Sequence, residues 1–277
     1  MKRAWEREKA KGKGVFILGG GTNLLIGDKG FPGLVIKPEF RTLTQNGEEI
    51  WAGSGVSMEH LLEFATLKKL SGLEWAGGLP GTVGGAIRGN AGAFGGEIKD
   101  NVRSVESATL SSKPTIARRT NEECRFGYRT SVFKERGGKE VILSAVFALK
   151  KGDRNRIREG IEEKIQYRKD RHPLEYPNIG SIFKNVDWCA VPQKHREVLR
   201  RIVKLDPVPV VPTAYLISEA GLKGISFGGA MISPKHPNFI VNVSNARAKD
   251  VEALIELVKT KVKKQFGVTL EEEVMYV

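Results

Sequence analysis

The sequence predicts an α+β protein, and two patterns in its 277 residues carry that prediction. Short β-branched runs separated by glycine turns fill the first part, which is typical of strands. Amphipathic periodicity over 157–171 and 250–265 predicts helices in the later part. At about 100 to 200 residues per domain, the length fits two domains, or one large domain with insertions, and the later change in composition favours two. We place them at 1–150 and 151–265, with a C-terminal tail, 266–277, that returns to the first.

The first expected elements are local and have clear ends. Strands are predicted at Val15–Leu18, which stops at Gly19, and at Leu34–Ile36, which follows a glycine turn that ends at Gly33. Ser57 is a suitable N-cap for a helix whose apolar face reaches Leu70, and Gly72 lies beyond its end. These residues therefore predict a strand, a glycine turn, a strand and a helix.

Residues 77–96 hold nine glycines. This density forbids an ordinary helix or strand of that length, because each glycine costs backbone entropy and offers no side chain to pack. Val141–Leu149 then alternates as a strand with its odd-numbered residues on one face.

The second domain begins after a charged turn near 151. Ile157, Ile161 and Ile165 mark a helix that runs to His172. The stretch HREVLRRIV, between two prolines, is a short helical candidate. In the last helix the apolar residues Val251, Leu254, Ile255, Val258 and Val262 face inward.

The charge is strongly positive, with 45 Lys and Arg against 32 Asp and Glu and a net charge of +13. Such an excess fits a nucleic acid, an acidic membrane face, an anionic small molecule or a solvated surface. No stretch approaches the roughly 18 to 20 apolar residues of a membrane span, so a cytoplasmic protein is expected. Cys124 and Cys189 are too few for a disulfide framework or a thiolate zinc site, and we expect no metal.

Two glycine-rich loops offer open backbone to a ligand. In LGGGTNLL, Leu18–Leu25, consecutive amides and the Thr22 hydroxyl can converge on a phosphate, although a tight turn explains the loop as well. Pro80–Ala86 and Gly89–Ala93 add further small residues. Together they suit an extended ligand that carries a pyrophosphate, the alternative being a glycine-rich packing interface.

Further segments combine small residues with functional groups, in this order: FGYRTSVFK, GSIFKN, LISEAGLKG, ISPKHPNFIVN and FGVTLEEEV. With FILGGGTNLL and GLPGTVGGAIRGNAGAFGGEI, they make the chain resemble the UDP-N-acetylenolpyruvoylglucosamine reductase family, the MurB flavoenzymes of peptidoglycan precursor synthesis. The resemblance extends from about Phe16 to the C-terminus.

This resemblance implies a vanillyl-alcohol-oxidase-like (PCMH-type) FAD-binding domain, followed by a smaller α+β substrate-binding domain. It implies an oxidoreductase in which NADPH reduces FAD, and hydride then passes to the enolpyruvyl ether of UDP-N-acetylglucosamine enolpyruvate to give UDP-N-acetylmuramate. The roles would be in cell wall biogenesis, cell shape and cell division. We expect a monomer that binds neither nucleic acid nor a membrane.

By position, three residues fall on the catalytic places of the family: Arg129, Ser181 and Glu273, with Glu271 as the fallback for Glu273. The FAD-binding places fall on Gly19, Gly20, Gly21, Thr22, Asn23, Leu24, Pro80, Gly81, Thr82, Gly84, Gly85, Asn90 and Gly92. Substrate contacts are expected from Tyr128, Lys184, Asn185, Lys223 and His236.

The residue types suit this chemistry. Negative charge builds beside the substrate carboxylate as hydride is added, and Arg129 can hold that carboxylate with two hydrogen bonds. Ser181 would donate the proton to carbon, with the amide of Gly180 or a water chain stabilising its conjugate base. Glu273, in its protonated form, could hydrogen-bond the developing charge.

The sequence departs from the family pattern in three places. Only fourteen residues precede the first strand at Val15, so either the start of the chain is misassigned or the first subdomain is shortened. Val186 and Asn178 stand where the family often has Pro and Ser, and an insert at 187–212 follows. Thr130 replaces the polar residue that commonly follows the Arg.

Two alternatives remain at this stage. A different FAD-dependent oxidase or dehydrogenase of the same fold would share the glycine loops, but GSIFKN and AGLKG argue against it. A basic nucleic-acid-binding protein would show clustered cations interleaved with aromatics, whereas the cations here are dispersed.

Overall fold

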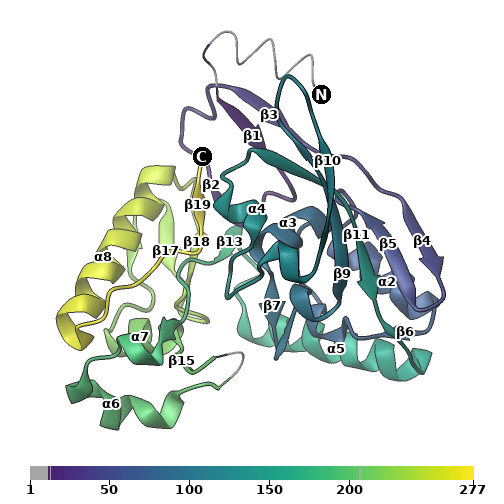
Figure 1. The fold of residues 1–277 in the computed structure, drawn as a ribbon. Coiled ribbons are helices and arrows are strands. Elements are labelled where there is room, and N and C mark those ends of the chain that lie inside the picture. Colours follow the sequence, from purple (N-terminus) through teal and green to yellow (C-terminus); the bar gives the residue numbers. More distant parts are fainter. Residues whose placement is uncertain (1–11, 13, 206–207) are drawn as a thin grey trace. The chain divides into compact units, whose positions relative to one another are not determined.

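The computed structural model describes residues 12, 14–205 and 208–277 (Figure 1). Their contacts divide the chain into two compact units. The first unit holds the described residues up to Gly21 together with Phe31–Tyr167, and the second holds Thr22–Gly30 with the described part of Arg168–Val277. Both units mix helices with sheets, so the α+β class is confirmed. The predicted domain limits, 1–150, 151–265 and 266–277, stay a prediction.

The expected short first subdomain falls mostly on residues 1–11 and 13, which lie outside the described part of the chain. The first described strand is β1, Val15–Ile17, and it pairs in parallel with β3, Leu34–Ile36. Both strands are where the sequence predicts them.

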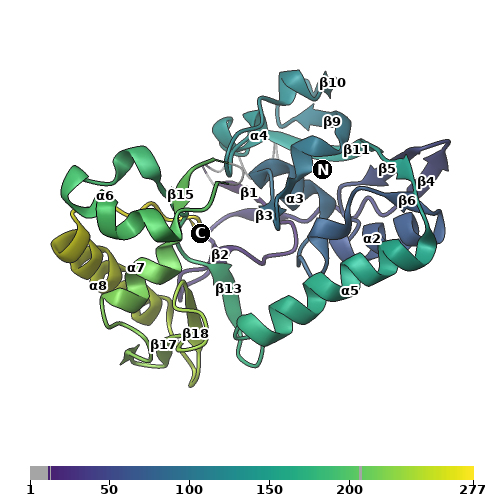
Figure 2. The same cartoon turned by 90° about the horizontal axis from the view of Figure 1, so that it is seen from below.

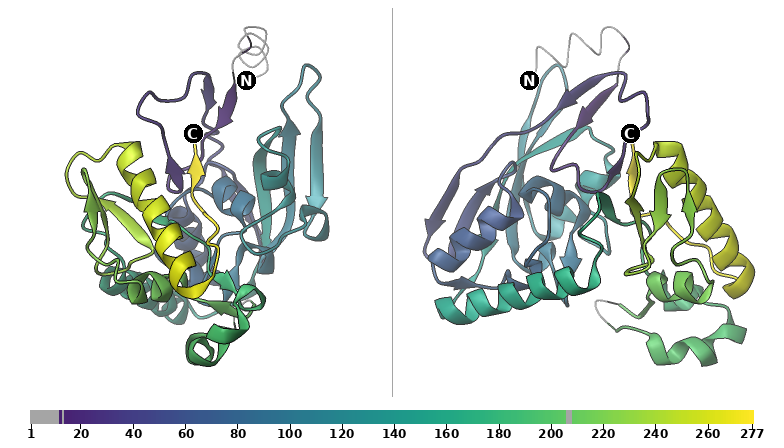
Figure 3. Two further views of the ribbon diagram at one scale, coloured as in Figure 1. Left: turned by 90° about the vertical axis from the view of Figure 1, so that its left-hand side faces the viewer. Right: turned by 180° about the vertical axis from the view of Figure 1, so that it is seen from behind.

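A five-stranded antiparallel sheet forms the frame of the first unit (Figures 1 and 3). Helices α2, Met58–Leu67, and α3, Val83–Gly89, pack on one face, where Ile50, Leu61 and Phe147 are fully buried. The sheet order is β10, Ile116–Thr120; β9, Val102–Thr109; β11, Glu140–Ala148; β5, Glu49–Gly53; and β4, Leu43–Asn46.

Helix α2 shows what the local pattern predicts and where it fails. The Ser57 hydroxyl accepts the N–H of His60 at 3.1 Å, as an N-cap should. The helix ends at Leu67, however, because Lys69 takes a positive φ of 56°. Leu70 lies in strand β6, Leu70–Ser71, so its predicted place on the helix face is wrong.

The glycine-rich stretch forms a short helix after all. Thr82 caps α3, and the fully buried Ile87 anchors it to the core. The helix ends at Asn90, whose φ of 43° lies in the left-handed region. A hairpin follows, in which β7, Gly92–Ala93, pairs with β8, Gly96–Glu97. Three of the seven helical residues, Val83, Ala86 and Ile87, are buried, and this packing offsets the cost of the glycines.

Strand β11 breaks its predicted alternation. A bulge between Ile142 and Ser144 leaves Leu143 without a partner on β9. Leu143 is only half-buried, whereas Ser144 is buried, so the prediction that all odd-numbered residues share the inner face is wrong. After the bulge, Ala145 and Phe147 face the core as expected.

One long helix and several short elements complete the first unit. Helix α5, Arg154–Arg171, starts in this unit, and its Gly160 lies against Glu74 (Figure 2). The others are η1, Glu74–Ala76; η2, Ile98–Asp100; η3, Glu122–Cys124; α4, Val132–Glu135; and β12, Lys150–Lys151, which pairs with β6.

The second unit packs helices α7, Thr213–Glu219, and α8, Ala248–Phe266, with a four-stranded sheet (Figure 1). The apolar face predicted for the last helix is confirmed, since Leu254, Ile255, Val258 and Val262 are buried. The strand order is β13, Asn178–Ser181; β18, Phe239–Asn242; β17, Ala230–Ile232; and β16, Ser226–Phe227.

The described residues of the predicted insert belong to this unit, and the two ends of the insert lie side by side. Strand β14, Val186–Asp187, pairs with β15, Val210–Val211, and so closes the insert. Between them lie η4, Trp188–Ala190; α6, Gln193–Leu199; and η5, Arg200–Ile202, where HREVLRRIV predicts a helix.

The tail ends in β19, Met275–Tyr276, which pairs in parallel with β2, Leu24–Leu25. None of the helices in the described ranges combines the length and the apolar character needed to span a bilayer.

Candidate active site

The two glycine loops touch each other in the first unit. A Cβ on Gly20 would lie 2.7 Å from the Cα of Gly81, and a Cβ on Gly19 would lie 3.1 Å from Thr82 Oγ1. The Thr82 hydroxyl also accepts the N–H of Gly85 at 3.4 Å. Sequence segments some sixty residues apart therefore form one surface of closely approaching backbone. Only glycine permits this approach, and it leaves amides free of Cβ atoms, as binding a phosphate along backbone requires.

The turn that bears Arg129 is tight and strained. Gly127 and Thr130 exchange both backbone hydrogen bonds, each at 3.1 Å. Arg129 has a φ of 58°, a conformation that costs a non-glycine residue roughly 1 to 2 kcal/mol. Strain of this kind clusters at functional sites, where the surrounding structure holds it in place.

Several contacts hold the Arg129 side chain and its backbone. Arg129 Nη2 donates to the carbonyl of Gly92 at 2.9 Å, and the guanidinium lies 5.3 Å from the ring centre of Tyr128. Lys134 Nζ donates to the Arg129 carbonyl at 2.9 Å, and Ser131 Oγ donates to the carbonyl of Arg88 at 2.7 Å. The guanidinium is thus directed by the β7–β8 hairpin that follows the second glycine loop.

The surroundings of Asn90 differ from those expected of a residue whose side chain contacts a cofactor. The residue is fully buried. Its Nδ2 donates to the carbonyl of Gly127 at 2.9 Å, and its Oδ1 accepts the N–H of Lys99 at 3.0 Å. The side chain therefore bonds to protein at both ends and has no exposed surface for a ligand.

In the second unit, the segment after Ser181 pairs with the C-terminal tail. The N–H of Glu273 donates to the carbonyl of Ile182 at 2.8 Å, and Phe183 forms an antiparallel bridge with Glu272. Asn23 Nδ2 donates to the Glu273 carbonyl at 3.0 Å. Three segments that are distant in sequence, around residues 23, 181 and 273, are therefore neighbours in this unit.

A bulge sets the direction of Ser181. Strands β13 and β18 pair at Asn178 and Ser181, and the register shifts between them, where Gly180 has a φ of 81°. The N–H of Gly180 donates to Asn178 Oδ1 at 3.1 Å. The expectation that this amide stabilises the Ser181 alkoxide is therefore wrong, because the side chain of Asn178 already accepts its hydrogen.

The three consecutive glutamates of the tail, Glu271–Glu273, have different surroundings. Lys184 Nζ lies 2.9 Å from Glu271 Oε2, and Lys259 Nζ lies 2.9 Å from Glu272 Oε1. Hydrogen bonds to Glu256 and Glu272 raise the pKa of Lys259, which keeps this lysine charged. Glu271 is also the most exposed of the ion-paired glutamates here, with 73% of its side chain accessible. Glu273 directly follows these two anchored residues in the chain.

The predicted substrate contacts differ in their environments. Asn185 Oδ1 accepts the N–H of Thr213 at 3.2 Å, and Lys223 is exposed in the turn after α7. His236 packs against Phe239 and His172, with ring centres 4.9 and 5.3 Å apart. Burial lowers the pKa of His236, which favours its neutral form.

Sequence reasoning missed Asn238, which fastens the strand that carries Ser181. Its Oδ1 accepts the N–H of Phe183 at 3.0 Å, and its Nδ2 donates to the Phe183 carbonyl at 2.8 Å. Its own carbonyl accepts the N–H of Ile182 at 2.8 Å. The available signal was Pro-Asn directly before the apolar run FIVN, because asparagine in a turn often bonds to backbone.

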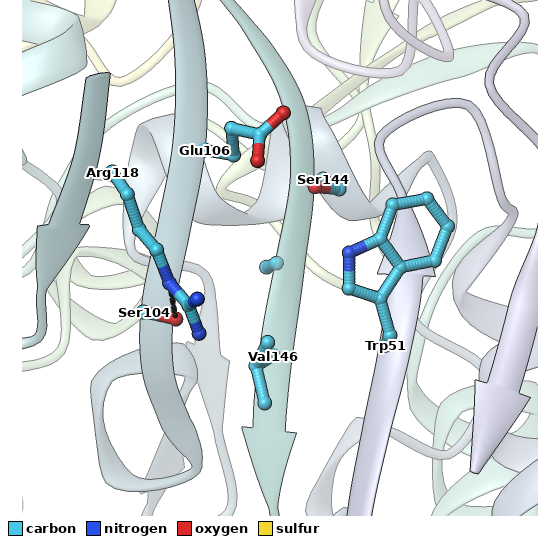
Figure 4. A pocket seen from close by; sticks show the side chains of 7 residues that line it. Trp51, Ser104, Glu106, Arg118, Ser144 and Val146 are labelled. Atoms are coloured by element: carbon cyan, nitrogen blue, oxygen red, sulfur yellow. Dashed lines mark hydrogen bonds between the residues drawn. The ribbon is translucent and has the colours of Figure 1, made fainter. Parts of the chain in front are cut away.

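A small hollow lies elsewhere, on the face of the large sheet opposite α2 and α3 (Figure 4). Trp51, Glu106 and Val146 line it, and Arg118 Nε donates to Ser104 Oγ there at 3.2 Å. It contains none of the predicted site residues. Among the described residues, no group of three or more His, Cys, Asp or Glu side chains could hold a metal ion.

Comparison with known proteins adds an independent finding. The profile of the UDP-N-acetylenolpyruvoylglucosamine reductase C-terminal domain matches residues 172–277, and that of an FAD binding domain matches residues 1–113. Over 263 residues the chain is 40% identical to the UDP-N-acetylenolpyruvoylglucosamine reductase of Caldanaerobacter subterraneus, which covers 95% of this chain and 78% of that protein. The enzyme of the same name from Geobacillus thermodenitrificans is 39% identical over 259 residues, or 93% of this chain and 77% of that protein.

A solved structure gives the same result. The crystal structure of UDP-N-acetylenolpyruvylglucosamine reductase from Thermus caldophilus matches with a TM-score of 0.73 at 31% identity. The match covers 98% of this chain and 88% of the other.

Proposed function

Because the chain belongs to the UDP-N-acetylenolpyruvoylglucosamine reductase family, as its ordered motifs predict, we propose that Arg129, Ser181 and Glu273 reduce the enolpyruvyl ether of UDP-N-acetylglucosamine enolpyruvate. Membership makes the chain an FAD-dependent oxidoreductase of peptidoglycan precursor synthesis. The observation that carries the assignment of the residues is the pairing of the strand after Ser181 with the tail that bears Glu273.

The glycine loops fit the cofactor. Gly19 and Gly20 approach Gly81 and Thr82 so closely that a Cβ would clash or crowd, so the two loops present backbone without Cβ atoms where they meet. These residues, with Gly84 and Gly85, would hold the FAD pyrophosphate. When bound and reduced by NADPH, FAD would supply the hydride that the substrate accepts. Thr22 and Asn23 continue the first loop and would lie near the same ligand.

Arg129 would hold the substrate carboxylate. Its bond to the Gly92 carbonyl fixes one side of the guanidinium, while the fork geometry of arginine matches a carboxylate. Charge that develops on the substrate as hydride is added then meets a cation that is already in place. Preorganised donors of this kind contribute roughly 10²- to 10³-fold to a rate.

Ser181 would deliver the proton to the carbon beside the carboxylate. The β-bulge at Gly180 re-aims residue 181 relative to a regular strand, and Asn238 fixes the residues that follow. A hydroxyl is a weak acid, so its conjugate base needs a donor. Since Asn178 takes the amide of Gly180, a bound water is the donor we propose.

Glu273 would act beside Ser181 as a hydrogen-bond donor to the developing charge. Its backbone is fixed from two sides, by Ile182 and by the side chain of Asn23. Glu271 instead forms an exposed ion pair with Lys184. We therefore assign the acid role to Glu273 and not to Glu271.

The remaining predicted contacts belong to substrate binding in this proposal. Tyr128 stacks by the Arg129 guanidinium, and Lys184, Asn185, Lys223 and His236 would contact the sugar, diphosphate or uridine. All partners are then small molecules, NADPH and the UDP-sugar, and we propose a monomer that needs no nucleic acid.

Half-reactions test the proposal directly. The purified yellow protein is reduced anaerobically with NADPH, and UDP-N-acetylglucosamine enolpyruvate is then added while the flavin absorbance is followed. Full reoxidation with formation of UDP-N-acetylmuramate is expected. A reduced flavin that the enolpyruvyl sugar does not reoxidise would contradict the proposal and point to another flavin enzyme of this fold.

A further inference from the structure

We infer that Asn90 is a positioning residue for Arg129, linking the cofactor loop to the turn that carries the catalytic cation. The inference rests on the proposed role of Arg129. Asn90 is the residue that ends α3, and it is fully buried, so it can touch neither substrate nor solvent. Its effect on the reaction must pass through the groups it bonds to.

One end of the Asn90 side chain fixes the start of the turn. Nδ2 donates to the carbonyl of Gly127 at 2.9 Å. The same carbonyl accepts the N–H of Thr130 at 3.1 Å, the bond that closes the turn around Tyr128 and Arg129. The strained φ of Arg129 persists only if this turn is held from outside, and Asn90 bonds to the atom on which the turn closes.

The other end fixes the place where the guanidinium is bound. Oδ1 accepts the N–H of Lys99 at 3.0 Å, directly after the β7–β8 hairpin. Ile98 closes the same hairpin by donating to Ala91 at 2.9 Å, and the carbonyl of Gly92 in this hairpin accepts Arg129 Nη2. One buried amide therefore holds both the backbone from which Arg129 leaves and the hairpin to which its side chain attaches.

This position also connects to the cofactor loop. Helix α3 is capped at its start by Thr82 in the second glycine loop and, after its seven residues, at its end by Asn90. A rigid single element thus spans from the proposed FAD cradle to the Arg129 turn. Displacing a reacting group by about 1 Å can cost about 100-fold in rate, so this link would control how well the cation meets the substrate carboxylate.

Two variants of Asn90 separate its hydrogen bond to Gly127 from its hydrogen bond to Lys99. Asn90→Gly keeps the left-handed backbone but removes both side-chain bonds. Asn90→Asp has almost the same shape, keeps the acceptor for Lys99 and loses the donor to Gly127. We expect both to slow flavin reoxidation by the enolpyruvyl sugar by about 10- to 100-fold while reduction by NADPH changes by less than about threefold. Amide hydrogen exchange at 127–130 should become faster in both holoenzymes.

Coupling to Arg129 supplies the decisive measurement. If Asn90 acts through Arg129, adding Asn90→Asp to Arg129→Lys should slow reoxidation by less than about threefold beyond Arg129→Lys alone, because the positioned group is already compromised. Asn121→Asp is the matched control. The Nδ2 of Asn121 donates to the carbonyls of Lys99 and Val102, and neither lies in the turn at 127–130. This variant should therefore not slow reoxidation selectively.

The outcomes are distinct. Wild-type protein that fails to be reoxidised by the enolpyruvyl sugar overturns the proposed function itself. Normal wild-type turnover with unchanged reoxidation in both Asn90 variants overturns only the positioning role. The positioning role is also overturned if the double variant slows reoxidation by the full product of the two single effects, Asn90→Asp and Arg129→Lys. It is overturned as well if Asn121→Asp slows reoxidation selectively.

Discussion

The N–H of Glu273 donates to the carbonyl of Ile182 at 2.8 Å, which places the tail glutamate one residue from Ser181 across a pair of strands. The pairing continues on one side, where the N–H of Lys184 donates to the carbonyl of Glu271 at 2.9 Å, while on the other side the tail pairs with a different segment, through Met275 and Asn23. A C-terminal segment and a mid-chain strand therefore share one register, and a shift by one residue would turn the Glu273 side chain to the other face.

The first prediction separates the adjacent glutamates. Glu273→Gln should lower kcat by about 100-fold or more, because the amide cannot supply an acidic proton. Glu271→Gln should leave kcat within about threefold, since an exposed ion pair of this kind contributes only about 0–1 kcal/mol. Steady-state kinetics with NADPH and the enolpyruvyl sugar provide the comparison. A larger loss of kcat in Glu271→Gln would reassign the acid.

The second prediction concerns the contact between the glycine loops. Gly20→Ala would place a Cβ 2.7 Å from the Cα of Gly81, so the apoprotein should lose about 1 to 3 kcal/mol of stability. Gly85→Ala meets only Thr82 Oγ1 at 3.5 Å and lies in α3, where alanine should stabilise by about 0.5 to 1 kcal/mol.

Flavin content distinguishes the two effects. If Gly85 contacts FAD, Gly85→Ala should yield a stable apoprotein that retains less flavin. Gly20→Ala should instead lower both the stability of the apoprotein and the flavin content. Thermal unfolding of the apoproteins and the absorbance of the purified holoproteins measure each quantity. Equal stability of the two apoproteins would show that the loops do not press together as described.

The third prediction tests a buried ion-pair network in the first unit. Glu140 has 2% of its side chain exposed and pairs with Arg119 at 2.9 Å and with Arg136. Glu140→Ala should cost about 3 to 5 kcal/mol in urea unfolding, because it leaves the guanidinium of Arg119 buried without its carboxylate. Glu39→Ala, which breaks exposed pairs with Lys37 and Arg41, is the control and should cost less than about 1 kcal/mol. Similar costs for both variants would rule out the buried network.

The local elements, including each of the two glycine-rich loops taken by itself, could be predicted from sequence because their causes are local. Ser57 caps its own helix, and the period of α8 follows from its own apolar residues. The bulge at Leu143 could not be predicted, because it depends on the register between β11 and β9. The positive φ of Lys69, which ends α2, likewise has no signature in that residue type.

The site shows the same division. The proposed site residues Arg129, Ser181 and Glu273 are inferred from motif order. In contrast, nothing in the sequence around Asn90 identifies Gly127, 37 positions away, as its hydrogen-bond partner. The partner of Asn238 is 55 positions away. Residues that bond to ligands carry recognisable chemistry, whereas residues that position them are defined by contacts that only the fold creates.

The last prediction concerns pH. Burial, followed by the nearby charges of His236, Arg168 and Lys235, lowers the pKa of His172 from 6.5 to about 4. Between these values the unfolded chain binds a proton that the folded protein does not, so the contribution of His172 to stability is complete above about pH 6.5 and is lost progressively towards pH 4. His172→Phe, which keeps a ring against Phe239, should flatten the pH dependence of the unfolding free energy over this range.

Urea unfolding at intervals from pH 7 to pH 4 measures that slope. His60→Gln on α2, whose side chain is exposed, is the matched control for losing an imidazole and should follow the wild-type curve. His236 stays in place in His172→Phe, and burial lowers its pKa too, so part of the acid sensitivity should remain. A His172→Phe protein that loses stability with the full wild-type slope would show that His172 takes up its proton as readily in the folded protein as in the unfolded chain.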